Sequence, residues 1–138
     1  MAGLIRFGVS MEESLIKKFD DYIKNKNYSN RSEAIRDMIR KNLVENEWVK
    51  KGEVACGIVI VYDHHKRELV NKLLDVQHDY STIIISTQHI HLDHDNCLEI
   101  VAVRGNVKNV EELANKLSSM KGVKHCAIAK TTIGSALE

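Results

Sequence analysis

IIISTQHIHLDHDNCLEIVAVR, residues 83–104, contains two apolar segments joined by a short polar one. Both segments are rich in the β-branched residues Ile and Val, which favours β-strands over residues 81–92 and 97–104. The polar segment LDHDN, residues 92–96, has the Asp and Asn residues that are typical of turns. The stretch therefore predicts an antiparallel β-hairpin.

The segments on either side of this hairpin extend the pattern to six elements. The apolar run over residues 54–62 predicts a strand and residues 65–77 a helix, both before the hairpin. Residues 110–120 then predict a helix and residues 123–131 a last strand. The order βαββαβ is that of the ferredoxin-like fold, so we expect such a domain over residues 53–138.

The first part of the chain has a different pattern. Residues 4–10 alternate like a strand, and Ser10 with Glu13 matches the capping box that begins a helix. Asn30 with Glu33 repeats that signature before a second apolar stripe that runs towards Trp48. A lone strand leaves an unpaired edge, which a second copy of the chain can cover by antiparallel pairing.

This βαα arrangement resembles the ribbon-helix-helix proteins over roughly residues 4–48. The segment YSNRSEAIRDMIR, residues 28–40, is similar to the second helix of that family. We therefore expect an α+β protein in which residues 1–50 form a DNA-binding and dimerisation domain, because a two-stranded ribbon fits the DNA major groove.

The composition is that of an ordinary globular protein, with 43% hydrophobic residues and a net charge of +1. Its three cysteines cannot all pair within one chain, and no basic segment followed by an apolar stretch opens the sequence. We therefore expect a reduced, cytoplasmic protein. The longest strand-like apolar run, VACGIVIVY, is far shorter than the ~20 residues of a membrane helix, so we expect no association with a membrane.

The hairpin carries three side chains that bind metals. Alternation places His89 and His91 on the same face of their strand, about 7 Å apart at the backbone. A five-residue connection would place Cys97 on that face, opposite His91, whereas a four-residue connection would place it on the other face. Surface histidines and a buried, apolar role for Cys97 are the alternatives to a metal site.

Taken over nearly the whole chain, the sequence resembles the nickel-responsive transcriptional regulators of the NikR type. The motif HDY-x8-HIH-x5-C, from His78 to Cys97, is followed by LEI and matches the family's nickel ligands without a gap. The resemblance implies that Ni²⁺, one per subunit, is bound by His78, His89, His91 and Cys97. In the family the histidine that corresponds to His78 comes from a different subunit.

The same resemblance implies a homotetramer, a dimer of dimers, that binds a palindromic double-stranded DNA operator and represses nickel uptake. Three imidazoles and a thiolate also suit copper or zinc, so a sensor of another divalent metal is an alternative. A small-molecule sensor with an ACT-type domain is a second alternative. We expect no enzyme, because four protein ligands would fill the position that a catalytic metal keeps open.

Several polar residues are candidates for contacts with DNA. In the family, the outward face of the strand that corresponds to residues 4–10 reads base edges. Gly8 departs from this pattern, because it has no side chain and stands where well-known members have a threonine. The start of the second helix suits a phosphate or serves only as a cap, and the basic pair after His65 matches one that the family uses against the DNA backbone. The predicted DNA contacts are Arg6, Gly8, Ser10, Asn30, Arg31, Lys66 and Arg67.

Three acidic residues are candidates for supporting roles. Glu33 and Asp37 are neighbours on one helix face, where salt bridges to nearby arginines are the ordinary interpretation. The family uses the corresponding pair for a potassium-like cation between its domains. Glu99 is predicted to orient a ligand imidazole, while His94 and His125 are expected to face solvent.

Overall fold

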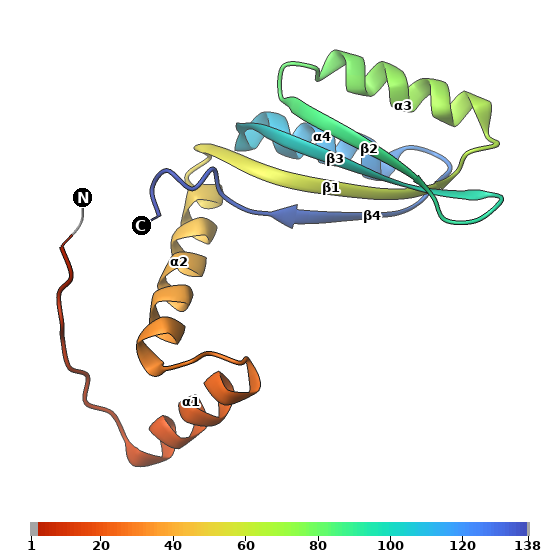
Figure 1. Cartoon of the computed structure of the whole chain (residues 1–138). Helices are drawn as coiled ribbons and strands as arrows, with labels where there is room; N and C mark the ends of the chain where they lie inside the picture. The colour runs from red at the N-terminus through yellow and green to blue at the C-terminus, as the bar shows by residue number, and fades with distance from the viewer. Residues whose placement is uncertain (1–2, 138) are drawn as a thin grey trace. The chain divides into compact units, whose positions relative to one another are not determined.

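The computed structural model describes residues 3–137, which divide into two compact units. The first unit contains the chain up to Glu45 together with the C-terminal end from Ala136, and the second contains Asn46–Ser135. Figure 1 labels the helices and strands of both units. None of the helices within the described residues is long and apolar enough to cross a membrane.

The first unit is built on two helices, α1 (Glu13–Asn25) and the start of α2 (Arg31–Val49). The apolar stripe of α1 ends in the buried Ile23, and Ala34 of α2 is fully buried. The side chain of Asn30 accepts a hydrogen bond of 2.8 Å from the backbone N–H of Glu33, so the second predicted helix cap is confirmed.

The capping box predicted at Ser10 is wrong. Helix α1 begins two residues later than expected, with Glu12 in an extended conformation at the cap position and without a side-chain cap bond. The Glu12 carbonyl accepts the first hydrogen bonds of the helix, from the N–H groups of Leu15 and Ile16. Ser10 therefore lies too far ahead of the helix to reach its free N–H groups.

Residues 3–12 form neither a helix nor a strand in the single chain. Leu4, Ile5 and Phe7 are 94%, 88% and 71% exposed. A β-strand is defined by hydrogen bonds to a neighbouring strand, and the predicted partner of this segment is a second copy of the chain. The strand over residues 4–10 is absent from the monomer for this reason, and its pairing stays a prediction.

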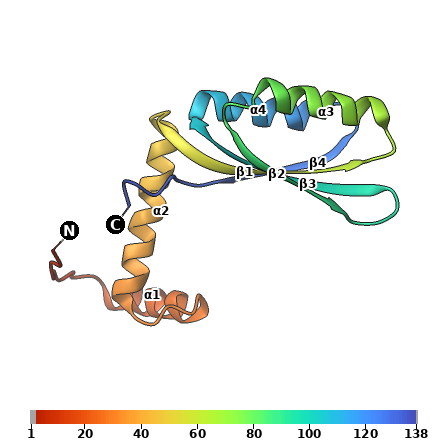
Figure 2. The ribbon, with the colours of Figure 1, turned by 45° about the horizontal axis from the view of Figure 1, so that its top comes forward.

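The second unit has the predicted βαββαβ order. Its elements are β1 (Glu53–Asp63), α3 (Arg67–Asp79), β2 (Ile84–His91), β3 (Asn96–Asn106), α4 (Val107–Ser119) and β4 (Val123–Lys130). The strands form an antiparallel sheet in the order β2-β3-β1-β4. Figure 2 shows that α3 and α4 lie on the same side of this sheet. The prediction of a ferredoxin-like domain is therefore confirmed.

The two faces of the sheet differ in what covers them. Along the central strands β1 and β3 every second side chain is buried beneath the two helices, as the period of a strand requires. The opposite face is apolar as well but only half-buried, and no helix of this unit lies on it. Its residues on the central strands include Val59, Val61, Leu98 and Ile100.

Candidate metal centre

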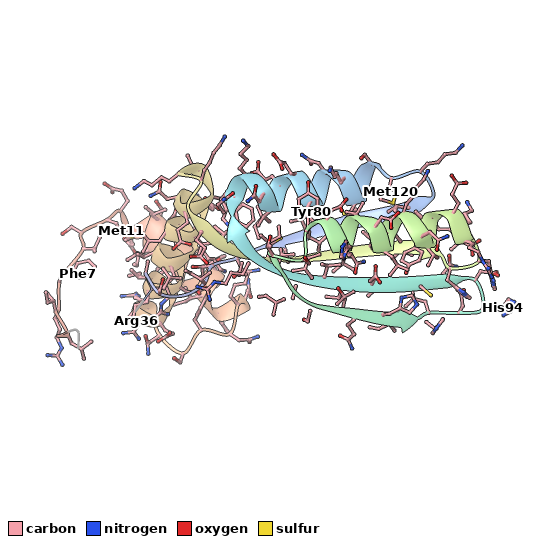
Figure 3. All side chains as sticks on the ribbon, turned by 90° about the horizontal axis from the view of Figure 1, so that it is seen from above. Phe7, Met11, Arg36, Tyr80, His94 and Met120 are labelled. Atoms are coloured by element: carbon pink, nitrogen blue, oxygen red, sulfur yellow. The ribbon has the colours of Figure 1, made fainter. Side chains whose placement is uncertain are left out.

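The register of the β2–β3 hairpin brings the predicted ligands together. His91 lies directly opposite Cys97, and His89 lies opposite Glu99. Five residues, 92–96, therefore separate the paired His91 and Cys97, and this spacing places Cys97 on the same face as both histidines. Figure 3 labels His94 at the tip of this hairpin.

The donor atoms at this end of the sheet are close to one another. Cys97 Sγ lies 3.4 Å from His91 Nδ1, and the rings of His89 and His91 have centroids 5.1 Å apart. Cys97 is fully buried, whereas both histidines are exposed at the edge strand. A buried sulfur and two accessible imidazoles therefore face the same space, and this donor set fits a late divalent transition metal.

Burial sets the chemistry of the Cys97 thiol. Burial raises the pKa of Cys97 above its ordinary value, and the carboxylates of Glu99, Asp93 and Asp63 raise it further. The thiolate is therefore unfavourable unless a cation compensates its charge. A bound dication supplies that compensation, because a coordinating thiol is deprotonated by the metal.

His89 is surrounded by groups that fix its ring. The Tyr62 hydroxyl lies 3.2 Å from His89 Nδ1, and Glu99 Oε1 lies 3.6 Å from the same nitrogen. Glu99 is only 7% exposed, and its other carboxylate oxygen accepts a hydrogen bond of 2.9 Å from Gln77. With Nδ1 facing these partners, Nε2 of His89 is the nitrogen left for a metal ion.

His64 joins the centre although the sequence analysis gave it no ligand role. His64, His91 and Cys97 each offer a donor atom within 4.8 Å of the others. His64 follows the end of β1, where Tyr62 pairs with Cys97. The central position of β1 beside β3 in a ferredoxin-like sheet is the signal that would have indicated this proximity.

His78 is the predicted ligand that the single chain does not bring to the centre. It lies exposed in the last turn of α3. Among the described residues it belongs to neither group of His, Cys and Asp side chains whose donor atoms converge. Of the predicted four, His91 and Cys97 have donor atoms in such a group, and His89 lies on the same face with its ring centroid 5.1 Å from that of His91.

The predicted DNA contacts lie in exposed positions. Arg6, Gly8 and Ser10 belong to the segment without secondary structure, while Lys66 and Arg67 mark the start of α3. Asn30 and Arg31 line a shallow hollow at the start of α2 together with Lys24 and Ser32. Arg31 makes two hydrogen bonds to Asp20, of 2.9 and 2.8 Å, which hold the pKa of Asp20 below its usual value.

Glu33 and Asp37 are both paired with basic side chains. Glu33 lies beside Arg36, and Lys41 Nζ lies 3.2 Å from the Asp37 carboxylate. Asp37 also accepts a hydrogen bond from the Tyr28 hydroxyl, and this bond, together with Lys41, lowers the pKa of Asp37. Glu33 thus has the arginine partner expected from the sequence, whereas Asp37 pairs with a lysine instead. His94 and His125 are exposed as predicted.

The second unit combines a ferredoxin-like fold with a nitrogen and sulfur centre at one end of its sheet, which defines a metal-binding α+β protein. Residues 55–131 match the family model described as the NikR C terminal nickel binding domain. By this match and by the relatives described next, the chain belongs to the family of nickel-responsive regulators of the NikR type.

Relatives match almost the whole chain. A protein of Syntrophus aciditrophicus is 54% identical over 97% of this chain and 98% of its own length. One from Chlorobium phaeobacteroides is 54% identical over 94% of this chain and 96% of its own length. One from Caldanaerobacter subterraneus is 49% identical over 99% of this chain and 90% of its own length. All three bear the name "Putative nickel-responsive regulator".

A solved structure supports the fold alone. An uncharacterized protein from Thermotoga maritima superposes with a TM-score of 0.52 at 13% sequence identity. The match covers 56% of this chain and 96% of the other.

Proposed function

We propose that this chain is a DNA-binding transcriptional regulator that represses nickel uptake when nickel binds. The observation that carries the proposal is the placement of His89, His91 and Cys97 on one face of the β2–β3 hairpin, with Cys97 Sγ 3.4 Å from His91 Nδ1. The identity of the metal as nickel is inferred from the family match, and two imidazoles and a thiolate are ligands that suit nickel. The comparisons do not favour the alternatives of a zinc, copper or small-molecule sensor.

The proposed nickel site takes three ligands from one subunit and His78 from another, with one ion per subunit. The exposure of both histidines supports this arrangement, because an edge strand is open to a neighbouring chain. Glu99 acts in this proposal on the ring of His89, from behind the coordinating nitrogen. Nickel when bound supplies the positive charge that stabilises the thiolate of Cys97.

Two apolar surfaces support assembly into a tetramer, a dimer of dimers. The first is the segment of residues 4–9, whose large side chains are exposed in the single chain and would be covered in a two-stranded ribbon. The second is the half-buried face of the sheet around Val59 and Ile100, which lacks a covering helix within its own unit. Together they give each chain one partner for its DNA-binding part and another for its metal-binding part.

The proposed ligand of the assembled protein is a palindromic double-stranded DNA operator. In the ribbon, Arg6 would contact base edges in the major groove, and Ser10 and Gly8 would lie on the same face. The N-terminus of α2 with Asn30 and Arg31 would contact a phosphate, because helix N-termini bind anions. Lys66 and Arg67 would neutralise further phosphates.

Nickel would favour DNA binding by linkage. An ion held between two subunits binds better to the assembled arrangement and so raises its population. The protein itself needs no catalysis for this, and the relatives named above are regulators by name. A potassium-like cation at Glu33 and Asp37 is a further part of the proposal, and it would have to compete with Arg36 and Lys41.

A subunit-mixing experiment tests the shared site. His78→Ala and Cys97→Ala each remove one ligand, so neither variant alone has a complete site. In a contact between the two variants, one site regains His78 from the Cys97→Ala chain and the other three ligands from the His78→Ala chain. We expect the thiolate-to-nickel absorption band and nickel-dependent operator binding to return in part after mixing.

His125→Ala is the matched control, because His125 is an exposed histidine of β4 that takes no part in the site. It should bind nickel and the operator like the wild type. Absence of any recovery in mixed tetramers that are shown to form by mass spectrometry would refute the inter-subunit site. Full nickel-dependent DNA binding by Cys97→Ala alone would refute Cys97 as a required ligand, and operator binding by the wild type that does not depend on nickel would refute the proposed function itself.

A further inference from the structure

A second group of metal-binding side chains lies outside the centre described above. His65, His94 and Asp95 each offer a donor atom within 4.8 Å of the others. His65 follows β1, whereas His94 and Asp95 belong to the β2–β3 hairpin. The group shares no residue with the cluster of His64, His91 and Cys97.

The two loops that carry this group are fixed to each other. The backbone N–H of His64 donates a hydrogen bond of 3.0 Å to the carbonyl of Asp95. The ring nitrogen Nε2 of His65 lies 3.0 Å from the His94 carbonyl and 3.5 Å from Asp95 Oδ1. The rings of His65 and His94 have centroids 5.1 Å apart. These contacts hold three side chains from two loops around one point.

Each loop is also stiffened by its own aspartate. Asp63 Oδ1 accepts a hydrogen bond of 2.9 Å from the N–H of His65. Asp93 Oδ1 accepts bonds of 2.9 and 2.8 Å from the N–H groups of Asp95 and Asn96. The backbone that carries the donors is therefore largely fixed, which lowers the conformational entropy that an ion would have to offset.

The charge around the group favours a cation. The carboxylates of Asp63, Asp93 and Asp95 lie in these two loops, and the nearby cations are Lys66 and Lys124. Lys124 is engaged at 2.5 Å by the side chain of Asn96. With neutral histidines the local charge is thus negative, and a dication would reverse it.

We propose that His65, His94 and Asp95 form a second metal site that takes a divalent transition ion and adjoins the first, because the rings of His64 and His65 have centroids 4.1 Å apart. Two imidazoles and one carboxylate suit zinc, copper or nickel, whereas magnesium and calcium prefer oxygen ligands alone. The side chains of His65, His94 and Asp95 are exposed, so water fills the remaining coordination positions. All three ligands come from one chain, and the site therefore fills without any partner subunit. It binds more weakly than a closed set of four ligands.

An ion bound at this site would link the loop before α3, through His65, to the hairpin tip, through His94 and Asp95. Lys66 and Arg67 directly follow His65, so an ion there would order the start of α3. The hairpin tip in turn lies next to the strand ends that hold His91 and Cys97. A second ion would thus act on the same two segments as the first, at higher metal concentration.

Zinc titration of the full chain tests this site independently of the first. A background with both His91→Ala and Cys97→Ser removes two ligands of the first centre, and calorimetry with Zn²⁺ alone then measures the second. Outer-shell partners alone change metal affinity about 10- to 100-fold, so loss of a ligand in His65→Ala or His94→Ala should weaken zinc binding about tenfold or more. Asp95→Asn should weaken zinc binding too, because it removes the negative charge of the ligand. It is a specific test, since the backbone contacts of the loop are kept.

His125→Ala on the same background is the control and should leave the zinc affinity unchanged. Nuclear magnetic resonance with Cu²⁺ as a paramagnetic probe gives a second measurement, in which the ring signals of His65 and His94 should broaden first. Equal zinc affinity in the His65→Ala, His94→Ala and His125→Ala chains would overturn the proposal. So would early broadening that is confined to the other histidines.

Discussion

Substitution of Glu99 by glutamine tests how the protein holds a metal-binding imidazole. Glu99 is 7% exposed, its Oε2 accepts a bond of 2.9 Å from Gln77, and its Oε1 lies 3.6 Å from Nδ1 of His89. Glutamine has the same shape but only one oxygen. Its amide nitrogen would therefore face a donor, either the amide of Gln77 or the ring N–H of His89.

The expected loss of nickel affinity can be bounded from these distances. Removal of a carboxylate partner of a metal-bound histidine lowers metal affinity about 10- to 100-fold. The separation of 3.6 Å is longer than a direct hydrogen bond, which places Glu99→Gln near the lower end, at about tenfold or ~1.4 kcal/mol.

Two effects of the lost charge oppose each other. The Glu99 carboxylate raises the pKa of Cys97, so its removal makes the thiolate easier to form. The bound centre, however, is a dication with one thiolate and keeps a net positive charge, which the carboxylate stabilises. The loss of attraction to the metal dominates, because the dication carries twice the charge of the thiolate. Nickel affinity should therefore fall in Glu99→Gln.

The assay is competition for nickel against a chelator of known affinity, followed by the thiolate-to-nickel absorption band. Glu53→Gln is the control, because Glu53 is a carboxylate on β1 that pairs with Arg104 at 2.7 Å and has no contact with the ligands. Thermal denaturation shows whether both variants are folded. Nickel affinity of Glu99→Gln within twofold of the wild type would refute the role assigned to Glu99.

Three further outcomes are expected. Gly105→Ala should lower the free energy of unfolding by about 1–3 kcal/mol in denaturant titrations, because its methyl would lie 2.8 Å from Ile83, whereas Gly52→Ala has open space and should change little. Asp37→Asn should lower the melting temperature at pH 7. This difference in melting temperature should vanish as the pH falls through the pKa of Asp37, which is lowered below its ordinary 3.8. If a cation binds at Glu33 and Asp37, added K⁺ should stabilise only the wild type. Burial raises the pKa of Cys56 to about 11, so roughly a thousandth is thiolate at pH 8. Mass spectrometry should therefore find Cys56 alkylated only after unfolding, and rapid labelling in the folded protein would contradict its position in the core.

The second unit was the part of the fold that the sequence predicted best. Each of its strands and helices buries one face, so the spacing of apolar residues carries the information. The ends of the elements were less certain. Helix α3 begins at Arg67 rather than at residue 65, because the N–H of His65 is bound by the carboxylate of Asp63 in a turn.

Short capping motifs were less reliable than apolar periodicity. The Asn30 signature marks a real helix start, whereas the similar one at Ser10 does not. Both have a polar residue followed by glutamate after three positions, so the motif alone cannot distinguish them. The decisive factor is where the extended backbone ends, and residues 3–12 lack a neighbour in the single chain that would define it.

The sequence predicted those parts of the candidate metal centre that lie on the β2–β3 pair. Alternation fixed the common face of His89 and His91, but the hairpin register was needed to add Cys97. His64 was missed because it comes from another loop and becomes a neighbour only through the pairing of β1 with β3. No pattern in one chain places His78, since its proposed partners belong to another subunit.

The pairing of His91 with Cys97 across five residues has a consequence for how this protein can change over evolution. Surface loops generally accept insertions and deletions. A gain or loss of one residue that slips the pairing of β2 with β3 would turn the sulfur away from both imidazoles, whereas one that is absorbed within the turn would leave His91 opposite Cys97. Any change in this exposed tip must therefore keep His91 paired with Cys97. A slip of this pairing by one residue would leave every ligand in the sequence and remove the site.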